Sequence, residues 1–217
     1  SNVLQFFDEA GDVVSVRPSG TEPKIKFYFG AKGDDADEKI AESAAATKEA
    51  YEAYADQAEA DAIAAASKGD TIVLAAGEYA GATIDKSLTI KGPNAGVNAN
   101  TGTRAAEAVI KGVFNVTSAA QNLTIDGLAF TGAAKVVYAE SVNYNGFVFQ
   151  NNKVYDTNDS AKAWDESRYS LPGFLQFTMS GSSVLSNVQV YNNSFVNVSE
   201  VNVLANRVSN MTVDGNV

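Results

Sequence analysis

The chain has 217 residues, 45% of them hydrophobic, and a formal net charge of −10. That length allows one large or two small domains, and the negative charge argues against nucleic acid or an anionic membrane as a partner. There are no cysteines and no histidines, which excludes disulfides, thiol-ligated metals and catalysis by imidazole. No run of about 18 apolar residues occurs, so the sequence predicts no membrane span.

The N-terminal part of the chain predicts three strands. The stretches "VLQFF" (3–7) and "VVSVR" (13–17) are rich in strand-forming residues and flank the turn "DEAGD" (8–12), which is the pattern of a hairpin. In "KIKFYF" (24–29), lysine alternates with apolar or aromatic residues, as in a half-buried strand.

A loop with the chemistry of an anion site lies between the second and third of these strands, in "VRPSGTEPKIKFY" (16–28). Gly20 lets the backbone approach a ligand closely, and Ser19 and Thr21 offer hydroxyl groups beside backbone N–H donors. Arg17 adds a guanidinium fork that suits phosphate oxygens. The alternative interpretation is an ordinary polar turn with a surface arginine.

The whole of residues 2–33 resembles the C-terminal domain of the α-D-phosphohexomutases, the phosphoglucomutase and phosphomannomutase family. The resemblance implies that Arg17, Ser19, Gly20 and Thr21 contact the phosphate of a phosphosugar. It also implies that Glu22 and Pro23 shape the loop and that Lys24 and Lys26 add to its positive field. The family's reaction needs magnesium and further loops, but no run like "DGDxDR" occurs. The expectation is phosphate binding without mutase turnover.

Residues 36–66 predict a helix, because nearly half of this segment is alanine, mixed with Glu, Lys and Asp. Positions spaced alternately by four and three form one narrow stripe, which indicates a surface helix lying on a core or, alternatively, a coiled-coil partner. The stripe consists of Ile40, Ala44, Thr47, Tyr51, Tyr54 and Ala58. Gly69 in "SKGD" (67–70) is the expected C-cap.

Residues 70–217 contain a repeat in which two alternating apolar residues precede Gly or Asn. The five copies are "LTIKGP" (88–93), "LTIDGL" (123–128), "FVFQNN" (147–152), "VQVYNN" (188–193) and "MTVDGN" (211–216). The second apolar positions, Ile90, Ile125, Phe149, Val190 and Val213, recur at intervals of 35, 24, 41 and 23. Without the insertions 94–105 and 158–174, these intervals become 23, 24, 24 and 23.

A constant period of this length predicts stacked coils of several short strands, with one column of apolar side chains pointing inward. The residues at the shared corner tolerate left-handed backbone angles, and they are Gly92, Gly127, Asn151, Asn192 and Gly215. Asn152, Asn193 and Asn216 follow one position later and are expected to form a structural amide ladder; contact with a ligand is the alternative.

This pattern resembles the right-handed parallel β-helix family, the pectate-lyase-like solenoids, over residues 58–217. The segment "ADAIAAASKGDTIVLAAGEYAG" (60–81) is similar to the family's N-terminal capping helix and first coil. The expected fold class is therefore mainly β: a right-handed parallel β-helix with an N-terminal capping helix, preceded by a small, partial α+β phosphohexomutase module. The expected domains are 1–35, 36–69 (helix, linker and cap) and 70–217.

Enzymes of the resembled family use acidic residues to hold calcium, but acids are sparse in this repeat. Asp126 and Asp214 share one register, with Gln150 and Tyr191 between them, so no metal site is predicted and no catalytic residue is assigned. The 158–174 insertion is a candidate carbohydrate contact, because aromatic rings can stack on sugars beside acids and a cation. Its candidate residues are Trp164, Asp165, Glu166, Arg168 and Tyr169. A solvated loop is the alternative.

Two main functional hypotheses follow for the whole chain. One is a non-catalytic fragment or fusion that joins a phosphosugar-binding loop to a β-helix with a carbohydrate-binding, surface or structural role. The other is a polysaccharide lyase or hydrolase whose active coils are partly missing, and a third possibility is an artificial fusion. The start at Ser1-Asn2 and the end within the repeat suggest a fragment. The β-helix suggests export, whereas the N-terminal module suggests the cytoplasm.

Overall fold

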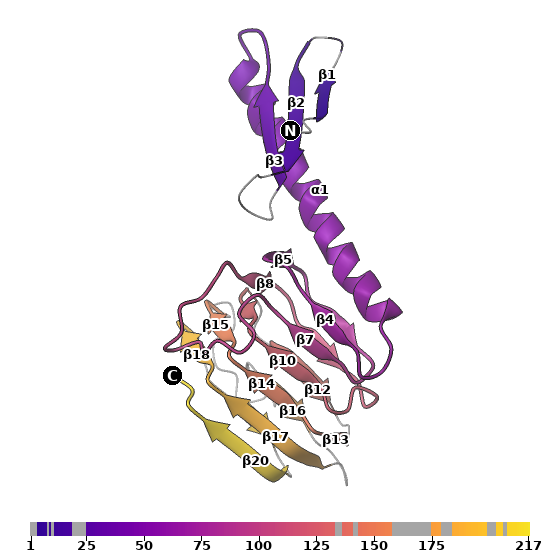
Figure 1. Cartoon of the computed structure of the whole chain (residues 1–217), viewed down its shortest axis with the longest axis vertical. Coiled ribbons are helices and arrows are strands. Elements are labelled where there is room, and N and C mark those ends of the chain that lie inside the picture. The colour runs from indigo at the N-terminus through magenta and orange to yellow at the C-terminus, as the bar shows by residue number, and fades with distance from the viewer. Residues whose placement is uncertain are drawn as a thin grey trace, which may run out of the picture. The chain divides into compact units, whose positions relative to one another are not determined.

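The computed structural model describes residues 4–7, 9, 11–18, 25–132, 136–140, 143–157, 175–178, 184–198, 203–205 and 208–217. The chain divides into two compact units, Ser1–Tyr54 and Ala55–Val217 (Figure 1). Helix α1 (Ala36–Ala65) passes from the first unit into the second. Within the described ranges, no helix combines the length and the apolar character that a membrane crossing requires.

The first unit contains an antiparallel sheet in the order β1-β2-β3. Its strands are β1 (Leu4–Phe7), β2 (Val13–Pro18) and β3 (Ile25–Gly30). The three predicted strands and the first hairpin are thus confirmed. Val14 pairs with Phe29 and Val16 pairs with Phe27, so alternation places these four apolar residues on one face of the sheet.

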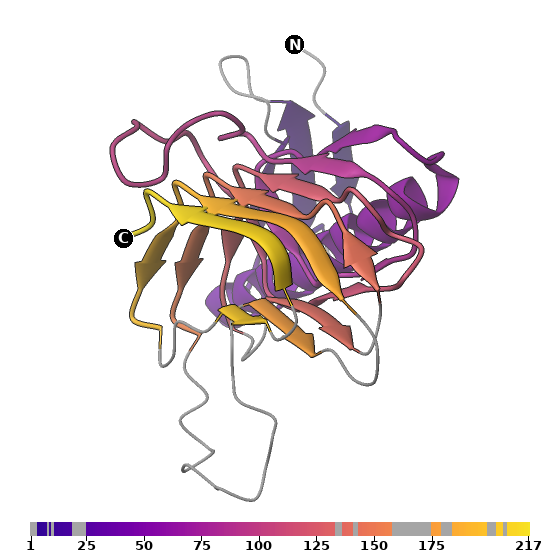
Figure 2. The same ribbon diagram turned by 90° about the horizontal axis from the view of Figure 1, so that it is seen from below.

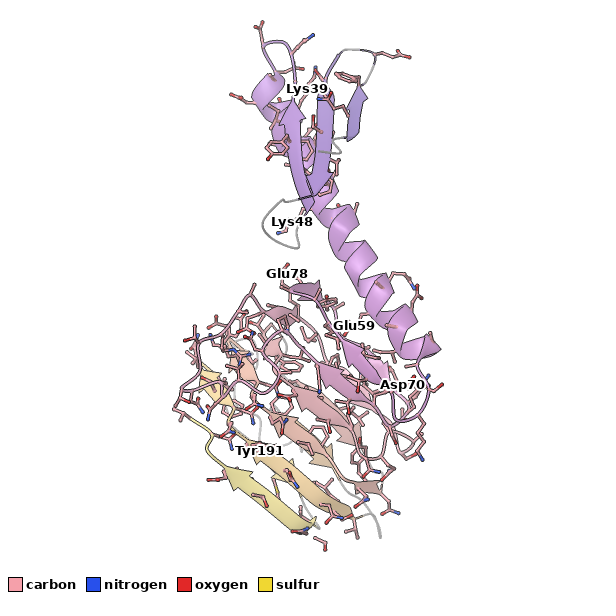
Figure 3. All side chains as sticks on the ribbon, viewed as in Figure 1. Lys39, Lys48, Glu59, Asp70, Glu78 and Tyr191 are labelled. Carbon is pink, nitrogen blue, oxygen red and sulfur yellow. The ribbon has the colours of Figure 1, made fainter. Side chains whose placement is uncertain are left out.

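The predicted apolar stripe along α1 is only partly correct. Ile40 and Thr47 are half-buried, whereas Ala44 and Ala58 are exposed. Among the helix positions whose side chains the structure describes, the buried ones are Glu59 and Ile63 in the second unit, which are 3% and 6% exposed. Glu59 is labelled in Figure 3. Ile63 joins the hydrophobic core of that unit. A narrow stripe of small residues did not reveal that the last turns of the helix pack on the core of the second unit; the side chains of Tyr51 and Tyr54, which belong to the stripe, lie outside the described part.

The end of α1 is capped by a lysine rather than by the expected glycine. Lys86 Nζ donates to the carbonyl oxygens of Ile63, Ala64 and Ala66 at 3.0, 3.1 and 3.2 Å. These carbonyls have no partner within the helix, and a cation near them is also favoured by the helix dipole. Gly69 has a φ of +94° and lies beyond the helix end at Ala65, in the turn that leads to β4, so the C-cap prediction is wrong.

The second unit is built from three parallel sheets (Figure 2). The long sheet has the order β13-β17-β14-β10-β7-β4, with β20 beside β17. Its strands are β4 (Thr71–Val73), β7 (Thr89–Lys91), β10 (Thr124–Asp126), β13 (Tyr144–Asn145), β14 (Val148–Gln150), β17 (Leu185–Tyr191) and β20 (Val208–Asp214).

The other two sheets have five strands each and are also parallel. The second sheet contains β5 (Gly77–Tyr79), β8 (Ala108–Ile110), β11 (Ala129–Phe130), β15 (Lys153–Tyr155) and β18 (Ser194–Val196). The third sheet contains β6 (Thr83–Ile84), β9 (Phe114–Val116), β12 (Val137–Glu140), β16 (Leu175–Thr178) and β19 (Val203–Ala205). The chain passes through the three sheets in turn, and we call one such pass a coil. A mainly β structure with parallel sheets is therefore confirmed.

The predicted register of the long sheet is correct. Ile125 pairs with Ile90 on one side and Phe149 on the other, and Val190 continues the column from Phe149 to Val213. The first four of these side chains are at most 1% exposed. Val213 keeps the register of the column, but its side chain is 55% exposed, so it is not buried as the other four are. Its strand β20 pairs with β17, and no described strand covers its other side.

The predicted corner is confirmed at four of its five positions. Gly127, Asn151, Asn192 and Gly215 have φ angles of 74°, 56°, 58° and 62°. Gly92 is not among the residues with positive φ, but a Cβ there would lie 2.3 Å from the Gly127 carbonyl oxygen. Two further columns of positive φ were not predicted. One lies where the chain leaves the second sheet and contains Gly81, Gly132, Asp156 and Asn197. The other marks a bend within the long sheet, since Asn187 and Asn210 lie inside β17 and β20, and it contains Asn122, Gly146, Asn187 and Asn210.

The predicted amide ladder is also present. The Asn193 side chain accepts from Asn152 N at 2.9 Å and donates to Asn216 Oδ1 at 2.8 Å. Each amide group also donates back to the preceding coil, to the carbonyl oxygens of Ile125, Phe149 and Val190 at 3.1, 2.9 and 2.9 Å. The ladder therefore satisfies backbone groups at the corner, as expected for buried polar side chains.

Candidate functional site

The candidate phosphate loop connects two paired strand ends. Pro18, the last residue of β2, pairs with Ile25, the first residue of β3, and Arg17 pairs with Lys26. The connection 19–24 therefore starts and ends at one end of the β2–β3 hairpin, and Arg17 and Lys26 lie opposite each other at its base. Ser19, Gly20 and Thr21, together with Glu22, Pro23 and Lys24, lie outside the described residues. Of Arg17, the structure describes the backbone.

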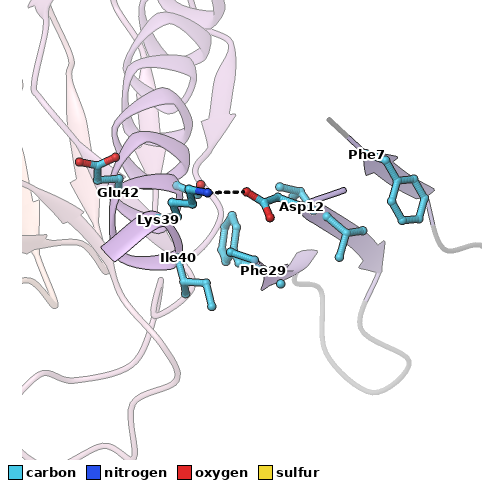
Figure 4. A pocket seen from close by; sticks show the side chains of 11 residues that line it. Phe7, Asp12, Phe29, Lys39, Ile40 and Glu42 are labelled. Atoms are coloured by element: carbon cyan, nitrogen blue, oxygen red, sulfur yellow. Dashed lines mark ion pairs between the residues drawn. The ribbon is translucent and has the colours of Figure 1, made fainter. Parts of the chain in front are cut away.

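A groove of about 400 Å³ lies elsewhere in the same unit, at the opposite end of β2 (Figure 4). It is lined by the end of β1, the start of β2, the end of β3 and the first turns of α1; the residues are Phe7, Asp12, Val13, Val14, Phe29, Gly30, Ala31, Lys39, Ile40, Glu42 and Ser43. Most of this lining is apolar. The groove is separate from loop 19–24, because Val13 begins the strand that Pro18 ends.

The cation in the groove is already paired with carboxylates. Lys39 Nζ lies 3.3 Å from Asp35 Oδ1 and 3.7 Å from Asp12 Oδ2. The hydrogen bond and the charge of Asp35, followed by the charge of Asp12, raise the pKa of Lys39. Asp12 also accepts from the backbone N of Lys32 at 2.8 Å. Two carboxylates around one ammonium group make this groove unsuitable for phosphate.

The polar column of the long sheet has the predicted register but no open acidic site. Asp126 pairs with Gln150, Gln150 with Tyr191, and Tyr191 with Asp214. Asp126 is 5% exposed, and its Oδ1 accepts from Asn151 Nδ2 at 2.7 Å while its Oδ2 accepts from Gln150 Nε2 at 2.8 Å. This carboxylate is therefore structural. Across the residues that the structure describes, no group of three or more acidic side chains could hold a metal ion.

The candidate carbohydrate residues lie outside the described part of the chain; they are Trp164, Asp165, Glu166, Arg168 and Tyr169. The described strands on either side show where their segment belongs in the topology. Tyr155 ends β15 in the second sheet and Leu175 begins β16 in the third sheet. Insertion 158–174 is therefore part of the connection between those two sheets.

Insertion 94–105 contains Arg104, a charged side chain that forms hydrogen bonds with several other residues. No role was predicted for this insertion from the sequence. Arg104 forms a two-point pair with Glu107, Nε to Oε1 at 2.7 Å and Nη2 to Oε2 at 2.9 Å. The two side chains are 8% and 19% exposed. Asn94 Nδ2 donates to Glu107 Oε2 at 2.8 Å. A single arginine in an otherwise uncharged loop was the available sequence signal.

Comparison with known proteins matches the N-terminal part of the chain. A family model described as "Phosphoglucomutase/phosphomannomutase, C-terminal domain" matches residues 1–47. A probable phosphomannomutase of Haemophilus influenzae is 53% identical over 45 residues, which are 19% of this chain and 9% of that protein. Residues 1–47 thus correspond to a phosphohexomutase C-terminal domain fragment. No solved structure matches the chain, and the resemblance of residues 58–217 to pectate-lyase-like proteins has no support from these comparisons.

Proposed function

We propose that loop 19–24, together with Arg17, binds the phosphate group of a phosphosugar and that this chain does not turn over as a mutase. The observation that carries the proposal is the match of residues 1–47 to the phosphohexomutase C-terminal domain, on a hairpin whose strands close at Pro18 and Ile25. In this proposal the guanidinium of Arg17, the hydroxyls of Ser19 and Thr21 and the backbone at Gly20 contact phosphate oxygens.

The affinity of such a loop should be low. The segment shared with the Haemophilus protein is 9% of that protein, so most of that protein has no counterpart in the match. A single anion contact in open solvent is strongly screened, since the Debye length is about 8 Å at physiological ionic strength. The net charge of −10 also opposes the approach of an anion. The proposal includes no metal ion, because the sequence has no run like "DGDxDR".

Arg17→Ala should abolish this binding. We expect inorganic phosphate and glucose 1-phosphate to shift backbone NMR signals of residues 17–24 with a dissociation constant of about 1 mM or weaker, and Arg17→Ala to remove those shifts. Lys68→Ala is the matched control, because Lys68 is exposed in the second unit and its loss changes the net charge equally. Shifts centred outside residues 17–24, or isomerisation of glucose 1-phosphate with magnesium and a bisphosphate activator, would refute the proposal.

For the second unit we propose a parallel β-helix that serves in binding or display. The support is the regular recurrence of strands in three parallel sheets, and right-handed winding is expected because crossovers between parallel strands are right-handed in about 98% of cases. A lyase or hydrolase with incomplete active coils and an artificial fusion remain alternative hypotheses. Within the binding hypothesis, the ligand is a polysaccharide contacted by Trp164 and Tyr169.

Deletion of residues 158–174 should remove any carbohydrate binding by this unit. We expect glycan-array or calorimetric binding to be lost when the deletion is joined by a short Gly-Ser linker, because the stacking rings and their neighbouring charges go with it. Trp164→Ala alone should weaken binding in the same direction. Binding that survives the deletion would show that this segment is not the contact.

A further inference from the structure

Insertion 94–105, which we call the strap, crosses the corner of successive coils. It follows β7, and its residues contact the corner that contains Gly127, Asn151, Asn192 and Gly215. The approach is direct: a Cβ added to Gly127 would lie 2.1 Å from the backbone N of Ala95. Gly96 N donates to Asp126 Oδ1 at 3.0 Å. The start of the strap is thus held against β10.

The rest of the strap donates to corner carbonyl groups. Arg104 Nη1 donates to the backbone carbonyl oxygen of Asn151 at 2.8 Å. The backbone N of Ala99 donates to the backbone carbonyl oxygen of Asn192 at 3.1 Å. Asn151 and Asn192 have the left-handed conformation, which turns the chain out of one sheet toward the next. The strap therefore supplies hydrogen-bond donors where the chain leaves the long sheet.

The tip of the strap reaches the last coil. Asn100 Nδ2 donates to the backbone carbonyl oxygens of Gly215 at 2.8 Å and of Asn193 at 3.1 Å. Asn98 Oδ1 accepts from the backbone N of Asn100 at 2.9 Å. The backbone carbonyl oxygen of Asn98 accepts from the backbone N of Gly102 at 2.9 Å, so a local turn orients the tip. Asn100 and Gly215 are 115 residues apart in the sequence.

From these contacts we infer that the strap is a conformational clasp, whose tip at Asn100 holds the coil of β20 against the coil of β17 and whose release opens the coil of β20 without opening the coil of β10 and β11. Among the described coils, the coil of β20 receives this contact at its corner, in addition to its strand pairing. Its strand β20 pairs with β17, and the side chains of Val213 and Val217 are 55% and 77% exposed. Asn100 donates to the coils of β17 and β20, whereas the coil of β10 and β11 is contacted by Ala95 and Gly96, so the stability of that earlier coil should not depend on Asn100.

Hydrogen exchange of the intact chain, followed by mass spectrometry, tests the inference. Asn100→Ala removes both tip donors, and Asn100→Asp places a carboxylate beside two carbonyl oxygens. We expect exchange of residues 208–217 to become about tenfold faster in the first variant, as for the loss of one to two ordinary hydrogen bonds, and faster still in the second. Exchange of residues 108–130 should stay unchanged. Thr101→Ala, at an exposed neighbouring position in the strap, should behave like the parent.

Two results would overturn the inference. Unchanged exchange of residues 208–217 in both Asn100 variants would show that the tip does not hold the last coil. Equal acceleration in 108–130 and 208–217 would show that Asn100 supports the whole unit rather than acting on one coil. Neither readout involves phosphate, so the result is independent of the function proposed for loop 19–24.

Discussion

Ile125→Asp is expected to abolish cooperative folding of the second unit. Ile125 is fully buried and lies between Ile90 and Phe149 in the central column of the long sheet. A carboxylate placed there has no cationic partner, and removing an unpaired charge from water costs several kcal/mol or more. That is comparable with the total stability of a typical domain, about 5–15 kcal/mol. Circular dichroism during heating should show no cooperative transition for this unit.

Val213→Asp is the matched control, because Val213 occupies the same column in β20. Its side chain is 55% exposed, so a carboxylate there remains in contact with water, and the expected change is below about 1 kcal/mol. The comparison separates the effect of the new side chain from the effect of its burial. An Ile125→Asp protein that melts near the parent temperature would disprove the buried register.

Arg104→Met should be the second most damaging of the proposed substitutions. Arg104 is 8% exposed and pairs with Glu107, and it also donates to the Asn151 oxygen. The pair is largely but not fully buried, so removing Arg104 leaves Glu107 with its Asn94 donor alone, which costs about 1–3 kcal/mol. We expect the midpoint of urea unfolding to fall accordingly, with the slope of the transition unchanged.

Lys111→Met provides the comparison for Arg104→Met. Lys111 Nζ lies 2.6 Å from Glu78 Oε2, but the two side chains are 48% and 42% exposed. Exposed ion pairs contribute about 0–1 kcal/mol, so this variant should unfold close to the parent. Similar small effects for both variants would show that the strap's ion pair is as well solvated as the surface pair.

Features that repeat along the chain could be predicted from the amino-acid sequence. The alternation in "LTIDGL" and its four relatives set the register of Ile90, Ile125, Phe149 and Val190. Gly and Asn at the following positions set one corner, because few other residues adopt positive φ. The three N-terminal strands were predictable from their alternating apolar residues and strand-forming residue types. The phosphate loop remains a prediction from sequence, since residues 19–24 lie outside the described part.

Which of these repeated features are buried, and which distant segments contact them, became visible in the folded structure. Val213 obeys the repeat but is exposed, because no described strand follows β20. Lys86 caps α1 from 20–23 residues away, and Asn100 reaches Gly215 across 115 residues. Periodicity reports which face of a strand is apolar, but not which element packs on that face. Such contacts between distant segments depend on how the coils stack, so no local pattern in the sequence encodes them.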